Sequence, residues 1–172
     1  MKWREIMRSD EAACQQCGAI HALDKLELTF FRPDAVIDLP ENARKQDVLE
    51  SDDLCVIRNE HYFVRATLPL PVHASEIPYR LGVWVQTSEA AFRRIYMLWS
   101  DESQANEPPF EVTIANRIST LPDTRGLAAS LQLTGPKTRP DVFVAVVGHP
   151  ITDQQRNGIT AHRAYEYTTS AR

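Results

Sequence analysis

The sequence lacks the features that mark several large classes of protein. Its longest strongly apolar run, Val142 to Val147, is far shorter than the roughly 20 residues that cross a bilayer. Lysine and arginine (19) are outnumbered by aspartate and glutamate (23), and the net charge of -4 disfavours a dedicated nucleic-acid-binding protein. The segment Met1 to Asp10 has no apolar core of the kind that signal peptides carry. We therefore expect a cytoplasmic protein whose partners are neither nucleic acids nor membranes.

Glycine and cysteine are also scarce. Only 6 glycines are present, which leaves few sites for the sharp loops that cradle phosphate groups. No nucleophile elbow of the Gly-x-Ser-x-Gly type occurs. The 3 cysteines are an odd number in a chain long enough to fold without cross-links, which argues against a disulfide framework. Cys14, Cys17 and Cys55 are therefore expected to be reduced thiols or metal ligands.

What is present is the composition of an ordinary globular domain. Hydrophobic residues make up 43% of the chain and charged residues 24%, which excludes disordered, collagen-like and coiled-coil proteins. The 172 residues show no internal repeat, low-complexity tract or Gly/Ser linker. We expect one domain that spans residues 1–172.

Short β-prone runs bounded by turn residues predict six or seven strands. The runs 54–58 and 62–67, separated by Asn59-Glu60-His61, predict a hairpin. In the run 80–87, Leu81, Val83 and Val85 share one parity, whereas Trp84 lies on the other, so the second face of this strand carries a large aromatic side chain. The remaining expected strands are 26–31, 110–115, 127–134 and 142–147.

Two or three helices are expected between these strands. Ser88 is a predicted N-cap of a helix over 89–99, whose apolar residues repeat every three or four positions and face a sheet. These apolar residues are Phe92, Ile95, Tyr96 and Trp99. Thr152 and Gln155 form a predicted capping box for a last helix over 153–165.

A third, short helix is expected over 41–49, after Pro40. Together these elements predict an α+β domain with a mainly antiparallel sheet and two or three helices.

The segment Cys14-Gln-Gln-Cys17-Gly18 has the form of a metal-binding knuckle, in which a tight turn directs two sulfur atoms at one ion. A structural zinc site has four ligands, so His21 and Cys55 are the candidates that complete it. Cys55 lies in a strand-like apolar run, where cysteine also serves as a small hydrophobic residue. Two free thiols in a turn, and a redox-active pair, stay open as alternatives to zinc.

Three further side chains are candidates for a binding surface. Arg65 lies inside the second strand of the expected hairpin and is expected on the sheet face opposite the core, paired with an acid. Trp84 lies on the second face of its strand, and His149 lies between an apolar strand and the last helix. The alternative for each is a structural role in the sheet, the core or a turn. Asp52 and Asp53 are expected to be solvated turn residues.

Several sequence blocks, in this order and at these spacings, resemble the bacterial family known as domain of unknown function 2199. The resemblance covers residues 14–162 and implies a small cytoplasmic bacterial protein, but it brings no established activity. The blocks are Cys14-x-x-Cys17-Gly18-x-x-His21, Asp53-Leu54-Cys55-Val56-Ile57, His61-Tyr62-Phe63-Val64-Arg65, Leu68-Pro69-Leu70-Pro71-Val72, Gly82-Val83-Trp84-Val85-x-x-Ser88-Glu89, His149-Pro150-Ile151 and Gln155-x-x-Gly158-Ile159.

The leading hypothesis is a non-enzymatic binding or interaction protein with a structural zinc knuckle, whose partner is a protein or a small molecule bound near Arg65, Trp84 and His149. One alternative is a zinc-dependent, hydrolase-like enzyme in which Cys14, Cys17 and a histidine leave one position of the metal open for water. A weaker alternative is a thiol redox sensor that uses the same two cysteines.

Overall fold

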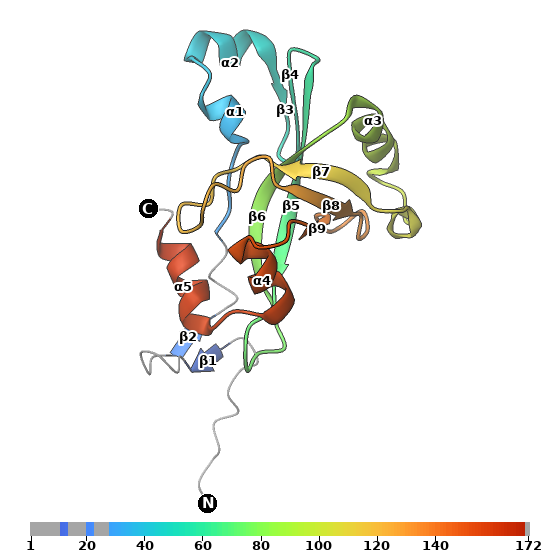
Figure 1. Ribbon diagram of the computed structural model, residues 1–172. Coiled ribbons are helices and arrows are strands. Elements are labelled where there is room, and N and C mark those ends of the chain that lie inside the picture. Colours follow the sequence, from blue (N-terminus) through green and yellow to red (C-terminus); the bar gives the residue numbers. More distant parts are fainter. Residues whose placement is uncertain (1–10, 14–19, 23–27, 171–172) are drawn as a thin grey trace, which may run out of the picture.

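The structure is a computed structural model that describes residues 11–13, 20–22 and 28–170 (Figure 1). A seven-stranded, mainly antiparallel sheet forms its body, in the order β3-β4-β5-β6-β7-β8-β9. A parallel pairing of Thr67 with Asp141 joins β5 to β9 and closes strands β5 to β9 into a small barrel. The strands are β3 (Val48–Glu50), β4 (Leu54–Ile57), β5 (His61–Leu70), β6 (Tyr79–Thr87), β7 (Phe110–Ile114), β8 (Ala128–Gln132) and β9 (Asp141–Val144).

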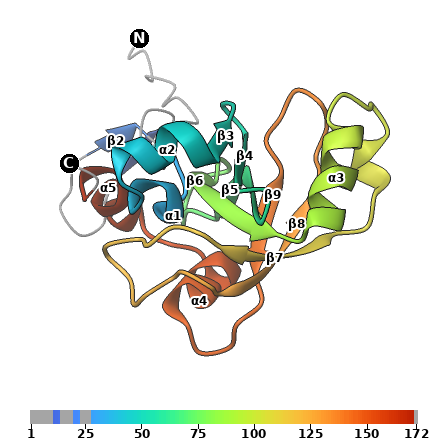
Figure 2. The same ribbon diagram turned by 90° about the horizontal axis from the view of Figure 1, so that it is seen from above.

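Five α-helices and a two-stranded sheet accompany the main sheet in the described part of the chain, so the predicted α+β class is confirmed and the predicted number of helices was too low. No helix among the described residues is both long and apolar enough to span a membrane. Helix α3 and helix α5 lie far apart from each other, and β2 lies beside α5 (Figures 1 and 2). The elements are β1 (Glu11–Ala13), β2 (Ile20–Ala22), α1 (Asp34–Ile37), α2 (Glu41–Asp47), α3 (Glu89–Leu98), α4 (Pro150–Asn157), α5 (Ala161–Thr169) and a 3-10 turn (Gln104–Asn106).

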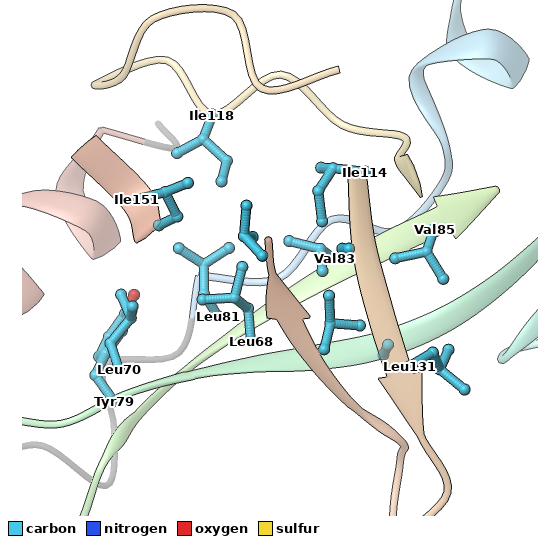
Figure 3. Packing of buried hydrophobic residues seen from close by; sticks show 14 of the residues in the cluster. Leu68, Leu70, Tyr79, Leu81, Val83, Val85, Ile114, Ile118, Leu131 and Ile151 are labelled. Carbon is cyan, nitrogen blue, oxygen red and sulfur yellow. The ribbon is translucent and has the colours of Figure 1, made fainter. Parts of the chain in front are cut away.

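The two faces of β5 and β6 bury different sets of side chains. The face that we call inner carries the main apolar cluster, shown in Figure 3, to which Leu81, Val83 and Val85 belong. Trp84 lies on the opposite, outer face, in a smaller cluster. The prediction that Trp84 and the three aliphatic residues lie on opposite faces of this strand is therefore confirmed. The other members of the smaller cluster are Val36, Cys55, Ile57, Phe63 and Ala115.

The expected strand over 26–31 does not form among its described residues. Thr29 makes only an isolated bridge with Gly82, and Pro33 then begins the approach to α1. Gly82 permits this bridge because a Cβ atom there would lie 2.9 Å from the Thr29 hydroxyl oxygen. The expected helix over 41–49 ends at Asp47, because the chain becomes extended at the next residue and pairs with β4 as β3.

The predicted last helix was wrong in its extent, because two helices stand in its place. Gly158 has a φ of 85°, a left-handed conformation that ends α4. The cap of α4 is His149, and Thr160 caps α5. Thr152 does not act as a cap, because its hydroxyl group donates to the Val146 carbonyl at 2.6 Å.

Helix α3 begins as predicted, since the Ser88 hydroxyl accepts a hydrogen bond from the Ala91 N–H at 3.2 Å. Its buried face agrees with the predicted stripe at Phe92, Ile95 and Trp99, which lie in or against the main apolar cluster, and differs from it at Tyr96. Ile95 and Leu98 are buried, whereas Tyr96 is exposed. The helix therefore covers the sheet with a narrow side and leaves part of its apolar surface open to solvent.

Candidate functional site

Strand β5 changes its hydrogen-bonding neighbour half-way along its length. Its first half pairs with β4, and its second half meets β9 at Thr67. The Arg65 N–H donates to the Asp53 carbonyl at 2.8 Å, just beyond the last β4 pair, whereas the Thr67 N–H donates to the Pro140 carbonyl at 2.8 Å. Arg65 therefore lies where β4 and β9 separate. We call this place, formed by Arg65, Asp53 and Arg139, the strand fork.

Register explains why these three residues converge. The antiparallel β4–β5 register, continued by one position, sets Asp53 opposite Arg65. The parallel pairing of Thr67 with Asp141, continued backwards by two positions, sets Arg139 beside Arg65 on the other side. The two arginines are close enough for the charge of Arg139 to lower the pKa of Arg65. One carboxylate and two guanidinium groups thus meet at the fork.

The Arg65 side chain is largely buried and makes one hydrogen bond within the described part of the chain. The residue is 8% exposed. Its Nη1 donates to the Asp52 carbonyl at 3.1 Å, and its buried Nε has no hydrogen-bond partner among the described residues. Burial, and then the charge of Arg139, lowers its pKa, although Asp53 and Asp52 act in the opposite direction. The expected ion pair of Arg65 with an acid is not formed within the described part of the protein.

An exposed aromatic ring and a surface pocket flank the fork. The Phe31 ring is 84% exposed, and its centroid lies 6.0 Å from the Arg65 guanidinium carbon. On the other side, the Arg139 Nε donates to the Asp53 carboxylate at 2.7 Å. A pocket of about 320 Å³ opens beside this ion pair and is also lined by Lys137. The side chains around the fork thus offer positive charge next to an accessible apolar surface.

Trp84 is close to Arg65 but is not itself exposed. The two residues are direct partners in the β5–β6 register, and the Trp84 ring lies on the outer face. Its indole N–H donates to the Phe30 carbonyl at 3.0 Å. Because the side chain is buried and its only polar group is bonded, Trp84 supports the outer face rather than presenting a contact surface.

The structure does not bring His149 to the fork. Its Nδ1 accepts a hydrogen bond from the Ile151 N–H at 3.2 Å, and Ile151 belongs to the main cluster on the inner face. The Nε2 of His149 is buried without a hydrogen-bond partner among the described residues. Arg65 and Trp84 therefore lie together on the outer face, whereas His149 lies at the start of α4.

The structure describes two of the four predicted zinc ligands, His21 and Cys55. Cys14 and Cys17 lie outside the described residues, and His21 lies in β2, beside α5. Cys55 is buried in β4, where burial and the nearby Glu50 carboxylate raise its thiol pKa to about 12. Cys55 packs in the smaller apolar cluster of the outer face, which is the setting of a small hydrophobic residue. The described residues contain no group of three or more His, Cys, Asp or Glu side chains placed to hold a metal.

The sequence profile of a family described as an uncharacterized protein conserved in bacteria (DUF2199) matches residues 13–159, which is most of the chain. The chain belongs to DUF2199. The resemblance drawn from the sequence blocks is thus confirmed. The DUF2199 region includes all three residues of the strand fork and ends before α5. No curated protein and no solved structure matches the chain.

Arg139 was missed by sequence analysis, and Asp53 was expected to be solvated. Nothing in the local sequence around Arg139 distinguishes it from other loop arginines, because its meeting with Arg65 depends on the parallel β5–β9 pairing. That pairing joins positions 74 residues apart, at Thr67 and Asp141. The one available signal was the polar Arg65 inside an otherwise apolar strand.

Proposed function

We propose that this DUF2199 protein is a non-enzymatic binding protein whose ligand contacts Arg65 at the strand fork. The observation that carries the proposal is a buried guanidinium with a free Nε and no carboxylate partner among the described residues. Taking a charge out of water without such a partner costs free energy, and apolar replacements of buried charges are often neutral or stabilising. A protein that retains a buried charge despite this loss of stability is expected to use the charge in its function.

The surroundings of the fork favour recognition as that use. Asp53 is engaged in an ion pair with Arg139, and Phe31 offers an exposed aromatic face beside Arg65. Arginine and aromatic side chains are the groups that most often anchor a partner at binding surfaces. They recognise charge and shape, and they are poor bases or nucleophiles at neutral pH.

The test compares two arginine-to-methionine substitutions of similar volume. Arg65→Met removes a buried charge that lacks a partner, so we expect the free energy of unfolding to rise by about 1 kcal/mol, or about 2–4 °C in Tm. Arg94→Met is the matched control, because it removes a guanidinium that forms two hydrogen bonds with the Glu107 carboxylate. This control is expected to leave stability unchanged or to lower it slightly.

Binding itself is read by native mass spectrometry of protein purified from a bacterial host. We expect a non-covalent adduct on the wild type and on Arg94→Met that is missing from Arg65→Met. A fall in stability of more than 1 kcal/mol in Arg65→Met, without any adduct on the wild type, would show that Arg65 has a purely structural role and would overturn the proposal.

The zinc knuckle formed by Cys14, Cys17 and His21 belongs to this proposal as a structural element and rests on the sequence motif alone. Metal analysis of the wild type and of Cys17→Ser tests it, with about one zinc per chain expected in the wild type only. A zinc ion with three protein ligands and a water would instead support the hydrolase-like alternative. A cytoplasmic location, without nucleic acid or membrane as partner, is likewise proposed from composition.

A further inference from the structure

We infer that the group recognised at the strand fork is a small oxyanion, a carboxylate or a phosphate, held between Arg65 and Arg139. The inference rests on the proposed function and names the chemistry of its ligand. It follows from the donors that the fork leaves unused, from the balance of charge there and from the shape of the guanidinium group.

The unused donors are the first argument. A guanidinium has five N–H donors in one plane, and for Arg65 the described residues supply one acceptor, the Asp52 carbonyl. Its Nε, which is buried and without a partner, lies in the edge of the guanidinium that binds an oxyanion through two parallel hydrogen bonds. Arg139 uses its Nε for Asp53, and its terminal amino groups have no acceptor among the described residues.

The balance of charge is the second argument. Arg65, Arg139 and Lys137 bring three positive charges to the fork and its pocket, against the two carboxylates of Asp52 and Asp53. Asp53 is committed to Arg139, and the Asp52 carboxylate makes no ion pair with Arg65. Two like charges held side by side repel each other, so an anion that lies between them is bound more tightly than at a single exposed arginine.

The position of Phe31 is the third argument. Its ring lies over the Arg65 guanidinium at 6.0 Å and is otherwise open to solvent. Such a ring covers one face of the guanidinium and does not use its in-plane N–H donors. A less hydrated guanidinium binds an oxyanion more strongly, because less water must be removed.

The experiment measures Tm in 10 mM inorganic phosphate, in 10 mM acetate and in sodium chloride of equal ionic strength. For a dissociation constant of about 1 mM, we expect the wild-type Tm to rise by about 4 °C in phosphate or in acetate relative to chloride. Arg65→Met should show no such rise. Arg93→Met, which removes an exposed arginine paired with Glu89 on α3, should behave as the wild type.

Each result decides the inference. A rise in acetate alone identifies a carboxylate ligand, and a rise in phosphate identifies a phosphate group. Equal rises in the wild type and in Arg65→Met would reflect a general effect of the salt and would overturn the inference. If neither salt acts while the Arg65-dependent adduct is still seen by mass spectrometry, the ligand is not an oxyanion, yet the proposed binding function stands.

A second variant keeps the test decisive if Arg65→Met does not fold. Arg65→Lys retains the positive charge but replaces the planar set of donors by a single ammonium group. We expect the anion affinity of this variant, measured by calorimetry with the salt that acts on the wild type, to fall at least tenfold. An unchanged affinity would show that Arg65 does not bind the anion through paired hydrogen bonds.

Discussion

The two faces of strands β5 and β6 are held together in different ways. On the inner face, Leu68, Leu81 and Val83 are completely buried among other apolar side chains. On the outer face, Trp84 shares its strand pair with the charged Arg65, and both use hydrogen bonds to neighbouring loops. The inner face is stabilised by the close packing of apolar side chains, whereas the outer face is also stabilised by directed hydrogen bonds.

This difference separates the parts of the sheet that stabilise the fold from those that are free to serve a ligand. Apolar packing needs no specific partner beyond a matching shape, so the inner face can be complete within one chain. A buried polar group that has no hydrogen-bond partner lowers the stability of the folded protein. The unfinished contacts of Arg65 on the outer face are therefore the more informative feature, because packing alone does not explain them.

The largest effect is expected from truncating the inner face. Leu68→Ala removes a side chain with no exposed surface and leaves a cavity in the main cluster, so we expect the free energy of unfolding to fall by about 3 kcal/mol. Urea denaturation measures this change. Leu49→Ala, at a β3 residue that is 72% exposed, is the control and should change stability by less than about 0.5 kcal/mol. Similar losses in both variants would contradict the assignment of the core.

A smaller but specific effect is expected from the polar contacts of the outer face. Asn116 is completely buried; its Oδ1 accepts from the Trp84 N–H at 2.7 Å, and its Nδ2 donates to the Arg32 carbonyl and the Asp34 carboxylate, both at 2.9 Å. Asn116→Ala leaves the Trp84 N–H without an acceptor, so we expect a loss of about 2 kcal/mol in urea denaturation. Asn106→Ala, at an exposed position, should have little effect. A neutral Asn116→Ala would show that water replaces these bonds.

The inner face could be predicted from the sequence to a large extent. The alternation of Leu81, Val83 and Val85 with Trp84 marks two buried faces, and local patterns of this kind need no knowledge of distant residues. The Ser88 cap was predictable for the same reason, since its partner lies three residues away. Predictions failed where a local signal was ambiguous, as at Thr152, which satisfies the pattern of a cap but bonds the Val146 carbonyl instead.

The strand fork could not be predicted, because it depends on closure of the barrel. Arg65 was singled out as a polar residue in an apolar strand, but its neighbour Arg139 comes from a loop that only the parallel β5–β9 pairing brings near. His149 was placed in the same candidate surface as Arg65, and the structure makes it the N-cap of α4 instead. Sequence patterns thus identify unusual residues, whereas tertiary pairing decides which of them meet.

Cys55 provides a last and smaller test of the outer face. Its thiol pKa is raised to about 12 by burial, and by Glu50, from an ordinary value near 9. The folded protein therefore holds the proton in a range of pH where the unfolded chain has lost it. The contribution of Cys55 to the free energy of unfolding is therefore fully present below about pH 9 and is lost as the pH rises towards 12.

Between pH 8 and pH 10 we expect this group to lower the free energy of unfolding by about 1.5 kcal/mol, measured by urea denaturation at each pH. Cys55→Ala should lack that loss, and because both proteins retain Cys14 and Cys17, the difference between the two curves isolates Cys55. A Cys55 thiolate bound to zinc would behave in the opposite way, because acid would protonate the ligand and release the metal. If the free energy of unfolding of the wild type falls at acid pH relative to that of Cys55→Ala, Cys55 is a zinc ligand. If it falls only at alkaline pH, Cys55 belongs to the apolar packing of the outer face.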